Sequence, residues 1–430
     1  MTPGQMGSKW QSGTKEYANV NSADDAANGH ARGAPAPDLR AHTWVAVIGF
    51  TVAMIDGYDT LVLSFIAPLI AKDWSLSPAT IGALFAASYA GAAVGATVIG
   101  VFSDRYGRKL MLLASMLIAG SLTVLCGWAQ DPIQLMVLRA CAGIGLGGAI
   151  PTIAALTAQH APVQSRNGAV TRMFLGYPIG AIVGGALTAW AMIQIGWRGV
   201  LFAGGTCALL LLVPIALGIP AGSPVFFQRP GRKFRPLASL VADGRGALTL
   251  LFCAAVFLML LTSYFLVSWT PALLTLHGMN PQRAAVAGAL LNVGGVAGAL
   301  LLSFNRGRTN PVLAVAAALT GGAILMVLFG QANVFSGGAA LAFVFAIGAL
   351  LIGAQTNIPA LAVHLYPESV YATGVGVPMA IGRIGSIVGP LIGGLLVSAQ
   401  IGWNWLFSLA AVPPAVAALC MGILVARGSK

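Results

Sequence analysis

The sequence predicts an all-α integral membrane protein with twelve membrane-spanning helices in two six-helix halves. Hydrophobic residues make up 57% of the 430 residues and charged residues only 8%, far from the composition of a soluble domain. The apolar residues form blocks long enough to cross the hydrocarbon core of a bilayer. The 55 glycines follow no Gly-X-Y period, and small residues let spanning helices pack closely.

Twelve apolar blocks divide the chain. They are 43–71, 79–100, 110–129, 132–158, 167–193, 198–219, 247–276, 281–304, 310–330, 334–365, 372–398 and 402–426. We therefore expect a disordered cytoplasmic tail (1–42), a first half (43–219), a cytoplasmic linker (220–246), a second half (247–426) and a short cytoplasmic tail (427–430).

The net charge of +12 arises from Lys and Arg whose positions indicate the membrane topology. With both termini on the same side, 18 of the 23 Lys and Arg lie on that side, and only Lys72, Arg198 and Arg283 lie on the other. Lys and Arg are retained on the cytoplasmic side, so both termini are predicted to be cytoplasmic. The excess of positive charge therefore does not indicate nucleic-acid binding. The expected partner is the lipid bilayer.

The five cysteines are predicted to be buried thiols. All lie in apolar blocks, with no CxxC and no His at metal spacing: Cys126, Cys141, Cys207, Cys253 and Cys420. No metal site is expected.

The two halves resemble each other. IGW at 195–197 recurs at 401–403, and IGAIVG at 179–184 recurs as IGSIVG at 384–389. Such a parallel repeat is similar to the arrangement of major facilitator transporters, whose substrate site lies between the halves near the middle of the membrane.

A ten-residue motif, GVFSDRYGRK, lies at 100–109. It matches the GxxxD(R/K)xGR(R/K) signature of the major facilitator superfamily through Gly100, Asp104, Arg105, Gly107 and Arg108. An Asp beside a basic turn can cap a helix end and pair with Arg, forming a latch that breaks when a transporter opens inward. Alternatively, the loop only sets topology. The corresponding turn at 305–308 lacks the Asp, so any latch there is expected to be weaker.

Charged residues inside the apolar blocks predict a functional site, because an ionisable group at that depth is costly. Arg139 begins RACAGIGLGG, which resembles the RxxxGxGxG pattern of the superfamily, and DGYD at 56–59 places Asp56 and Asp59 on one helix face. At 1.5 Å per residue, Asp59 and Arg139 are expected to meet at similar depth. Such a carboxylate can take up and release a proton, so Asp56, Asp59 and Arg139 are the predicted proton-coupling residues. The alternative is a static ion pair.

Arg383 is the predicted anchor for a substrate carboxylate. It lies near mid-membrane in 372–398 without an acid in its own segment, and a guanidinium binds a carboxylate bidentately. An interhelical ion pair and snorkelling remain alternatives. Further predicted substrate contacts are Tyr58, Trp269, Gln355 and Asn357. Other aromatic residues supply either ring contacts or packing: Phe85, Tyr89, Tyr177 and Tyr264.

Together with DGYD, the 100–109 motif and Arg139, the stretch ATGVG at 372–376 and Arg383 resemble the aromatic acid:H⁺ symporter family over residues 43–426. The resemblance implies import of a benzoate-like or hydroxybenzoate-like anion across the bacterial inner membrane. It implies a proton as coupling ion and no other cofactor, and we expect a monomer. By resemblance, Asp104 and Gly107 serve gating.

Three positions depart from the family pattern. Thr152 replaces an Asn, Gln159-His160 replaces a Glu-Tyr pair, and Tyr371 replaces an Arg. Losing a Glu and an Arg from corresponding loops is either a compensated pair or a sign of another substrate or altered gating.

The sequence leaves some other functions open and disfavours others. A uniporter or exporter of another organic anion or drug-like compound remains an alternative, although the export-type GxxxGPxxGG pattern is only approximated at 176–185 and occurs instead at 385–394. No HExxH or other catalytic pair is present, so an enzyme is not expected. A channel would need a repeated pore motif, which is missing, whereas a sensor on a transporter scaffold remains open.

Overall fold

A computed structural model describes residues 39–162, 165–220, 240, 245–304, 310–332, 337–367 and 370–428. In this part of the chain, twelve helical segments are long and apolar enough to cross a membrane. They coincide with the twelve predicted blocks and differ from them by a few residues at the ends, so the predicted fold class is confirmed. The predicted tails and linker lie mostly outside the described residues, although the first helix already begins at Leu39.

The first half (the N-half) contains α2 (Leu39–Trp74), α3 (Pro78–Tyr106), α4 (Arg108–Cys126), α5 (Pro132–His160), α6 (Arg166–Phe174), α7 (Gly176–Gln194), α8 (Gly196–Leu210) and α9 (Leu212–Gly218). The second half (the C-half) contains α11 (Gly246–Leu276), α12 (Pro281–Phe304), α13 (Pro311–Ala332), α14 (Gly338–Thr356), α15 (Ile358–Leu365), α16 (Tyr371–Ser398), α17 (Trp403–Ala410) and α18 (Val412–Gly428).

Four spans are interrupted shortly before a proline. The α6/α7, α8/α9, α14/α15 and α17/α18 breaks each precede a proline by two to four residues: Pro178, Pro214, Pro359 and Pro413. Proline has no N–H to donate to the carbonyl one turn earlier, and its ring clashes with that turn. Five other prolines lie inside uninterrupted helices, so proline permits a break without enforcing it.

Glycines bring matching helix pairs of the two halves into backbone contact. A Cβ on Gly91 or Gly147 would clash with the backbone of the facing helix in the α3–α5 pair. In the C-half, Gly294 and Gly298 do the same between α12 and α14. These are the second and fourth spans of each half, so the internal repeat extends to the helix packing.

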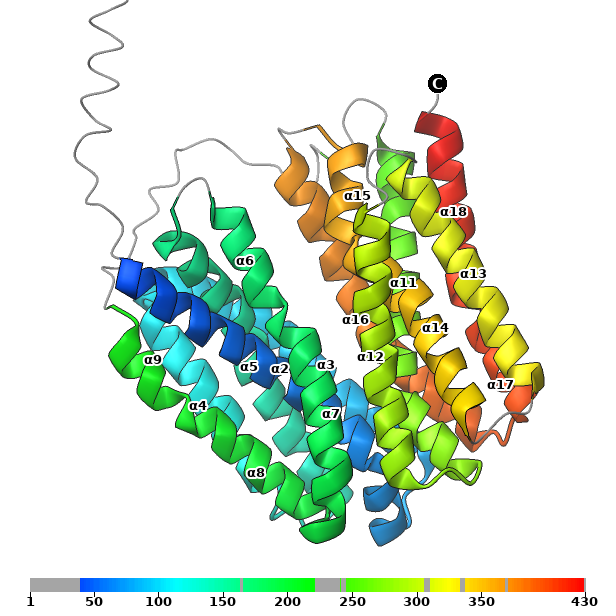
Figure 1. Cartoon of the computed structure of the whole chain (residues 1–430), viewed down its shortest axis with the longest axis horizontal. Helices are drawn as coiled ribbons and strands as arrows, with labels where there is room; N and C mark the ends of the chain where they lie inside the picture. The colour runs from blue at the N-terminus through cyan, green and yellow to red at the C-terminus, as the bar shows by residue number, and fades with distance from the viewer. Residues whose placement is uncertain are drawn as a thin grey trace, which may run out of the picture.

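The halves pack on each other mainly through α3 with α16, α7 with α12, and α2 with α11. Ala79 N–H, at the start of α3, donates to Oγ of Ser398, at the end of α16, at 2.9 Å. In Figure 1 the ribbons of the halves lie together at this lower end. They diverge toward the upper end, where α2 begins and α18 ends. We call the upper end the terminal end and the lower the opposite end.

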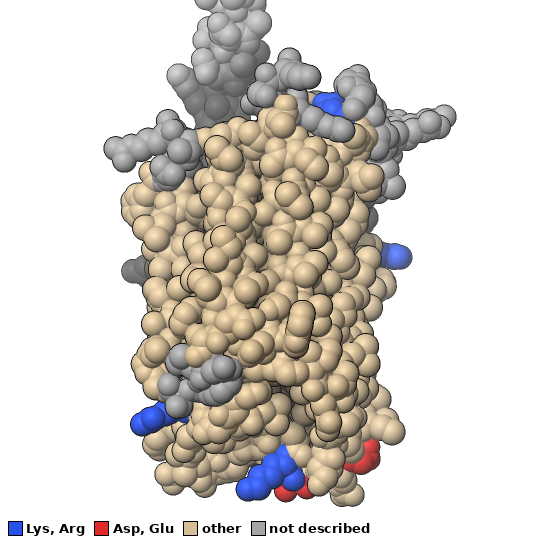
Figure 2. Space-filling model, turned by 90° about the vertical axis from the view of Figure 1, so that its right-hand side faces the viewer, with Lys and Arg blue, Asp and Glu red and all other residues tan. Residues whose placement is uncertain are grey.

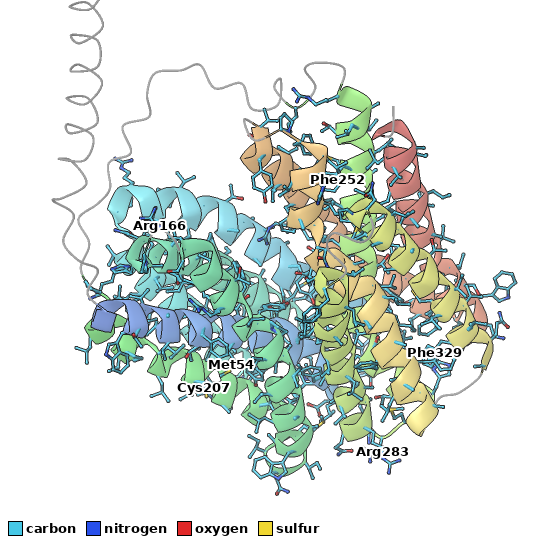
Figure 3. The ribbon with its side chains drawn as sticks, turned by 45° about the horizontal axis from the view of Figure 1, so that its top comes forward. Met54, Arg166, Cys207, Phe252, Arg283 and Phe329 are labelled. Carbon is cyan, nitrogen blue, oxygen red and sulfur yellow. The ribbon has the colours of Figure 1, made fainter. Side chains whose placement is uncertain are left out.

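Charged side chains lie mainly at the two ends. The face shown in Figure 2 is almost entirely uncharged along its middle. Figure 3 shows Arg166 at the terminal end and Arg283 at the opposite end. The prediction that all five cysteines are buried is wrong for three of them. Cys126 and Cys253 are buried, but Cys207 is exposed and Cys141 and Cys420 are half-buried. A helix face turned to lipid is as apolar as one turned to protein, so hydropathy does not distinguish them.

The α3–α5 contact gives a test of the packing. Gly147→Ala places a methyl group against the backbone of Ala92, and overpacking of this kind costs about 1–3 kcal/mol. We expect the detergent-extracted variant to aggregate at a lower temperature than the wild type. Gly422→Ala on α18 is the matched control, because a Cβ there meets nothing within 4 Å. An unchanged melting temperature for Gly147→Ala would mean that α3 and α5 are not held at backbone contact.

Candidate functional site between and within the halves

A buried ion pair joins α2 to α5. Asp59 is 4% exposed and Arg139 is 2% exposed. Nη2 of Arg139 donates to Oδ2 of Asp59 at 2.9 Å, and Nη1 donates to Oδ1 at 3.2 Å. Nη2 also donates to the backbone carbonyl of Asp59 at 3.0 Å. The two residues therefore meet as the depth estimate predicted.

Side chains from α3 and α4 surround the pair. Nε of Arg139 donates to Oγ of Ser88 on α3 at 3.4 Å, and Oγ1 of Thr123 on α4 donates to Oδ1 of Asp59 at 3.0 Å. Cys126, also on α4, lies beside the guanidinium. Both charges are thus paired and hydrogen-bonded, as an ion pair at membrane depth requires.

A second charged group lies where the halves meet. Arg383 of α16 acts electrostatically on Asp56 of α2 and on Tyr264 of α11, which places its guanidinium at the junction. Within the described part of the chain, Arg383 has no acidic partner within 4.0 Å and its side chain donates no hydrogen bond. Its side chain is exposed and Asp56 is half-buried, so the guanidinium is available to an anionic ligand.

Tyrosines from three helices lie at this junction. Tyr89 of α3 stacks edge-on against Tyr264, with ring centroids 4.8 Å apart. Its hydroxyl lies 3.1 Å from Oγ of Ser268 on α11, a hydrogen bond between the halves. Tyr177 of α7 adjoins Tyr264 and Asp56. The junction therefore combines phenol rings and hydroxyls with a cation that has no acidic partner among the described residues.

The 100–109 motif forms the turn between α3 and α4. Gly107 has a φ of 97°, which favours glycine because it has no Cβ. Nη1 of Arg108 donates to the backbone carbonyl of Ala155 and to Oε1 of Gln159, both on α5 and both at 3.2 Å. Nζ of Lys109 donates to the carbonyl of Ala216 on α9 at 2.6 Å. The motif thus ties α4 to its neighbours at the terminal end.

Comparison with known proteins decides the family. The family model of the Major Facilitator Superfamily matches residues 49–383, well over half of the chain. The chain belongs to the Major Facilitator Superfamily. It is therefore a membrane transporter and not an enzyme, and the described residues contain no cluster of three or more metal-ligating side chains.

The transporter's relatives are similar over nearly their whole length. The gallate transporter of Pseudomonas putida is 33% identical, with 89% of this chain and 92% of the relative aligned. The 4-hydroxybenzoate transporter PcaK of Acinetobacter baylyi is 30% identical, with 95% and 96% aligned. The 3-(3-hydroxy-phenyl)propionate transporter of Escherichia coli is 32% identical, with 89% and 93% aligned.

Solved structures show the same fold. A bacterial homologue of the human lysosomal transporter Spinster, in an inward-facing and unoccupied conformation, has a TM-score of 0.69 at 18% identity. The alignment covers 91% of this chain and 97% of that one. The D-xylose-proton symporter has a TM-score of 0.68 at 17% identity, over 88% and 97%. At these identities the likeness concerns the fold alone.

Two predicted substrate contacts, Tyr58 and Trp269, are packed against neighbouring helices. Tyr58 turns into the N-half, where its hydroxyl donates to the carbonyl of Val200 at 3.2 Å and its ring lies against Gly184 and Gly204. Trp269 is 1% exposed, and its Nε1 donates to the carbonyl of Pro390 at 2.9 Å. Trp269 also stacks edge-on with Phe85 of α3, so it seals the junction of the halves.

The other predicted residues are placed as follows. Gln355 and Asn357 lie at the α14/α15 break, where Nδ2 of Asn357 donates to the carbonyl of Gly353 at 2.9 Å. A Cβ on Gly100 would meet nothing within 4 Å, and the guanidinium of Arg105 lies 5.4 Å from the ring centroid of its neighbour Tyr106. The side chain of Asp104 and the turn at 305–308 lie outside the described residues, so the latch stays a prediction.

The departures from the family pattern have partners in the structure. Gln159 provides a neutral acceptor for Arg108 where the family usually has a carboxylate. Nδ1 of His160 lies 2.9 Å from the carbonyl of Leu156. The hydroxyl of Tyr371 donates to the carbonyl of Pro359 at 3.3 Å. Arg108 is therefore not left without an acceptor by the loss of the Glu.

Three residues beside the ion pair were not predicted as site residues: Ser88, Thr123 and Cys126. Each is one of several small polar residues in an apolar block, and nothing in its own segment distinguishes it. Their importance arises only because α3 and α4 pack beside Arg139. To predict these residues, one would have to know that the helices at 79–100 and 110–129 pack against the helix at 132–158.

The ion pair predicts a stability pattern. Arg139→Leu leaves the Asp59 carboxylate without its buried partner, which costs about 3–5 kcal/mol in buried pairs. We expect this variant to melt well below the wild type in detergent. The double variant Asp59→Leu/Arg139→Leu removes the stranded charge and should melt above the single variant. Equal melting of the single and double variants would show that the pair is not what these helices depend on.

Proposed function

We propose that this transporter imports an aromatic carboxylate with a proton across the bacterial inner membrane by alternating access. The observation that carries the proposal is Arg383, an exposed guanidinium at the junction of the halves with no acidic partner within 4.0 Å in the described residues. A guanidinium holds a carboxylate through two parallel hydrogen bonds. A substrate carboxylate supplies this missing partner.

The surroundings of Arg383 support an aromatic substrate. Tyr264 and Tyr177 adjoin the same site and offer ring faces and hydroxyls. Three relatives are named as transporters of gallate, 4-hydroxybenzoate and 3-(3-hydroxy-phenyl)propionate, and each is at least 30% identical to this chain. We propose the same class of hydroxylated aromatic acid here.

The N-half supports proton coupling. Asp59 and Arg139 form a buried pair whose carboxylate can be protonated only if the pair is broken or rearranged. Asp56 interacts electrostatically both with Asp59 of this pair and with Arg383. A proton taken up by these aspartates offsets the charge that an anionic substrate brings.

The packing of the halves supports an inward-facing state. The hydrogen bond between Ala79 and Ser398 and the close approach of Gly82 to Pro390 both lie toward the opposite end. The excess of Lys and Arg assigns the terminal end to the cytoplasm. On this assignment the halves are closed toward the outside, and rocking about the junction opens the site to the outside.

Uptake measurements test the substrate and the coupling. Cells expressing the protein should accumulate labelled 4-hydroxybenzoate, and a protonophore should abolish the accumulation. Arg383→Ala should lower kcat/KM roughly 100-fold through loss of a bidentate charged contact. Arg283→Ala removes an exposed arginine at the opposite end and should leave uptake unchanged. Equal uptake by both variants would remove Arg383 from the site.

The same measurements separate the alternatives. Uptake that survives the protonophore identifies a uniporter, and lower accumulation in expressing cells than in control cells identifies an exporter. No transport of any aromatic acid by a membrane-inserted protein would overturn the substrate class.

The topology has its own test. A green fluorescent protein fused after Lys430 should fluoresce, and alkaline phosphatase fused there should be inactive, because the terminal end is proposed to be cytoplasmic. Fusions at the loop between α12 and α11, near Met279, should behave in the opposite way. Active phosphatase at the C-terminus would reverse the orientation and the proposed inward-facing assignment with it.

A further inference from the structure

Thr123 uses its hydroxyl differently from several other helical threonines among the described residues. Helical threonines tend to donate to the carbonyl four residues earlier, as Thr97, Thr152, Thr262 and Thr320 do here. Thr123 is 2% exposed, and its Oγ1 donates instead to Oδ1 of Asp59 on another helix at 3.0 Å. The donor is therefore directed at the carboxylate by the packing of α4.

The bond is selective for one protonation state. Oδ1 of Asp59 accepts from both Thr123 and Nη1 of Arg139, while Oδ2 accepts from Nη2. A hydroxyl donor favours the ionised carboxylate, because the ionised oxygen is the stronger acceptor. Loss of this donor therefore makes protonation of Asp59 easier.

The other groups that act on the site are few. Among the described residues, the titratable groups facing Asp59 and its partner are Arg139 on α5, Cys126 on α4, Tyr89 on α3, and Asp56 and Tyr58 on α2 itself. Arg139 bonds to the carboxylate through two charge-assisted hydrogen bonds, which are stronger than neutral ones. Thr123 supplies an uncharged donor that can be removed without stranding a charge.

We infer that Thr123 is a positioning residue of the proton site: its hydroxyl holds Asp59 in the ionised state and so sets the proton concentration at which the transporter loads its proton. The inference rests on the proposed coupling of transport to protonation of Asp59. It concerns the pH at which the cycle runs, not the choice of substrate.

The test is the pH profile of exchange. Labelled 4-hydroxybenzoate is exchanged against unlabelled 4-hydroxybenzoate in proteoliposomes with equal pH on both faces, so no proton gradient contributes. Thr123→Val keeps the shape and removes the donor, and we expect the profile to shift by about one pH unit toward alkaline pH. Thr123→Ser keeps the donor and should restore the wild-type profile.

A matched control separates the donor from the packing. Thr262 is also 2% exposed, and its hydroxyl bonds only to its own helix, at the carbonyl of Leu258. Thr262→Val should therefore leave the profile unmoved. Rates are compared per inserted protein, so a loss of folded material does not alter the position of the profile.

Several outcomes overturn the inference. A Thr123→Val profile that coincides with the wild type, or a Thr123→Ser profile that shifts as far as Thr123→Val, removes Thr123 from the proton site. If wild-type exchange proceeds and shows no dependence on pH, the proposed proton coupling fails first. If Asp59→Asn abolishes the pH dependence and Thr123→Val does not move it, the coupling stands and only the role of Thr123 falls.

Discussion

The buried pair of Asp59 and Arg139 is the interaction on which the architecture of the N-half depends. It brings α2 and α5 together at membrane depth, and Ser88 and Thr123 bring α3 and α4 to the same point. An ion pair of this kind is stable only while both partners and their hydrogen bonds are in place, because a single stranded charge has no water to compensate it. The geometry of four helices is therefore tied to the charge state of one carboxylate.

Close helix packing makes each half a stiff unit. The α3–α5 and α12–α14 pairs are in backbone contact through glycines, so the paired helices have little room to shift against each other. The junction is different, since it depends on individual side chains such as Tyr89 with Ser268 and Trp269 with Phe85. Two stiff units joined by separable contacts can rock as bodies, which is what alternating access requires.

Hydropathy was sufficient to predict the twelve spans, because a spanning helix must be apolar around its whole circumference over a fixed length. The meeting of Asp59 and Arg139 was also predictable, since intramembrane charges need partners and the rise per residue gives their depth. Rotational position was not predictable in the same way. Tyr58 lies between Asp56 and Asp59 in DGYD, yet its ring turns into the N-half. The contact of Thr123 with Asp59 likewise depends on which face of α4 meets its neighbours. Hydropathy contains no signal for which face of a uniformly apolar helix meets which neighbour.

The two charged sites belong to different halves and adjoin through α3. Ser88 accepts from Arg139 within the N-half, and the next residue, Tyr89, crosses to Ser268 and Tyr264 of the C-half. Tyr264 in turn lies within the electrostatic reach of Arg383. One turn of α3 therefore contacts both the ion pair and the junction near the candidate anion site. Under the proposed proton coupling, a rearrangement of Arg139 on protonation of Asp59 would bear directly on how the halves pack, and no longer chain of residues is needed to connect the two sites.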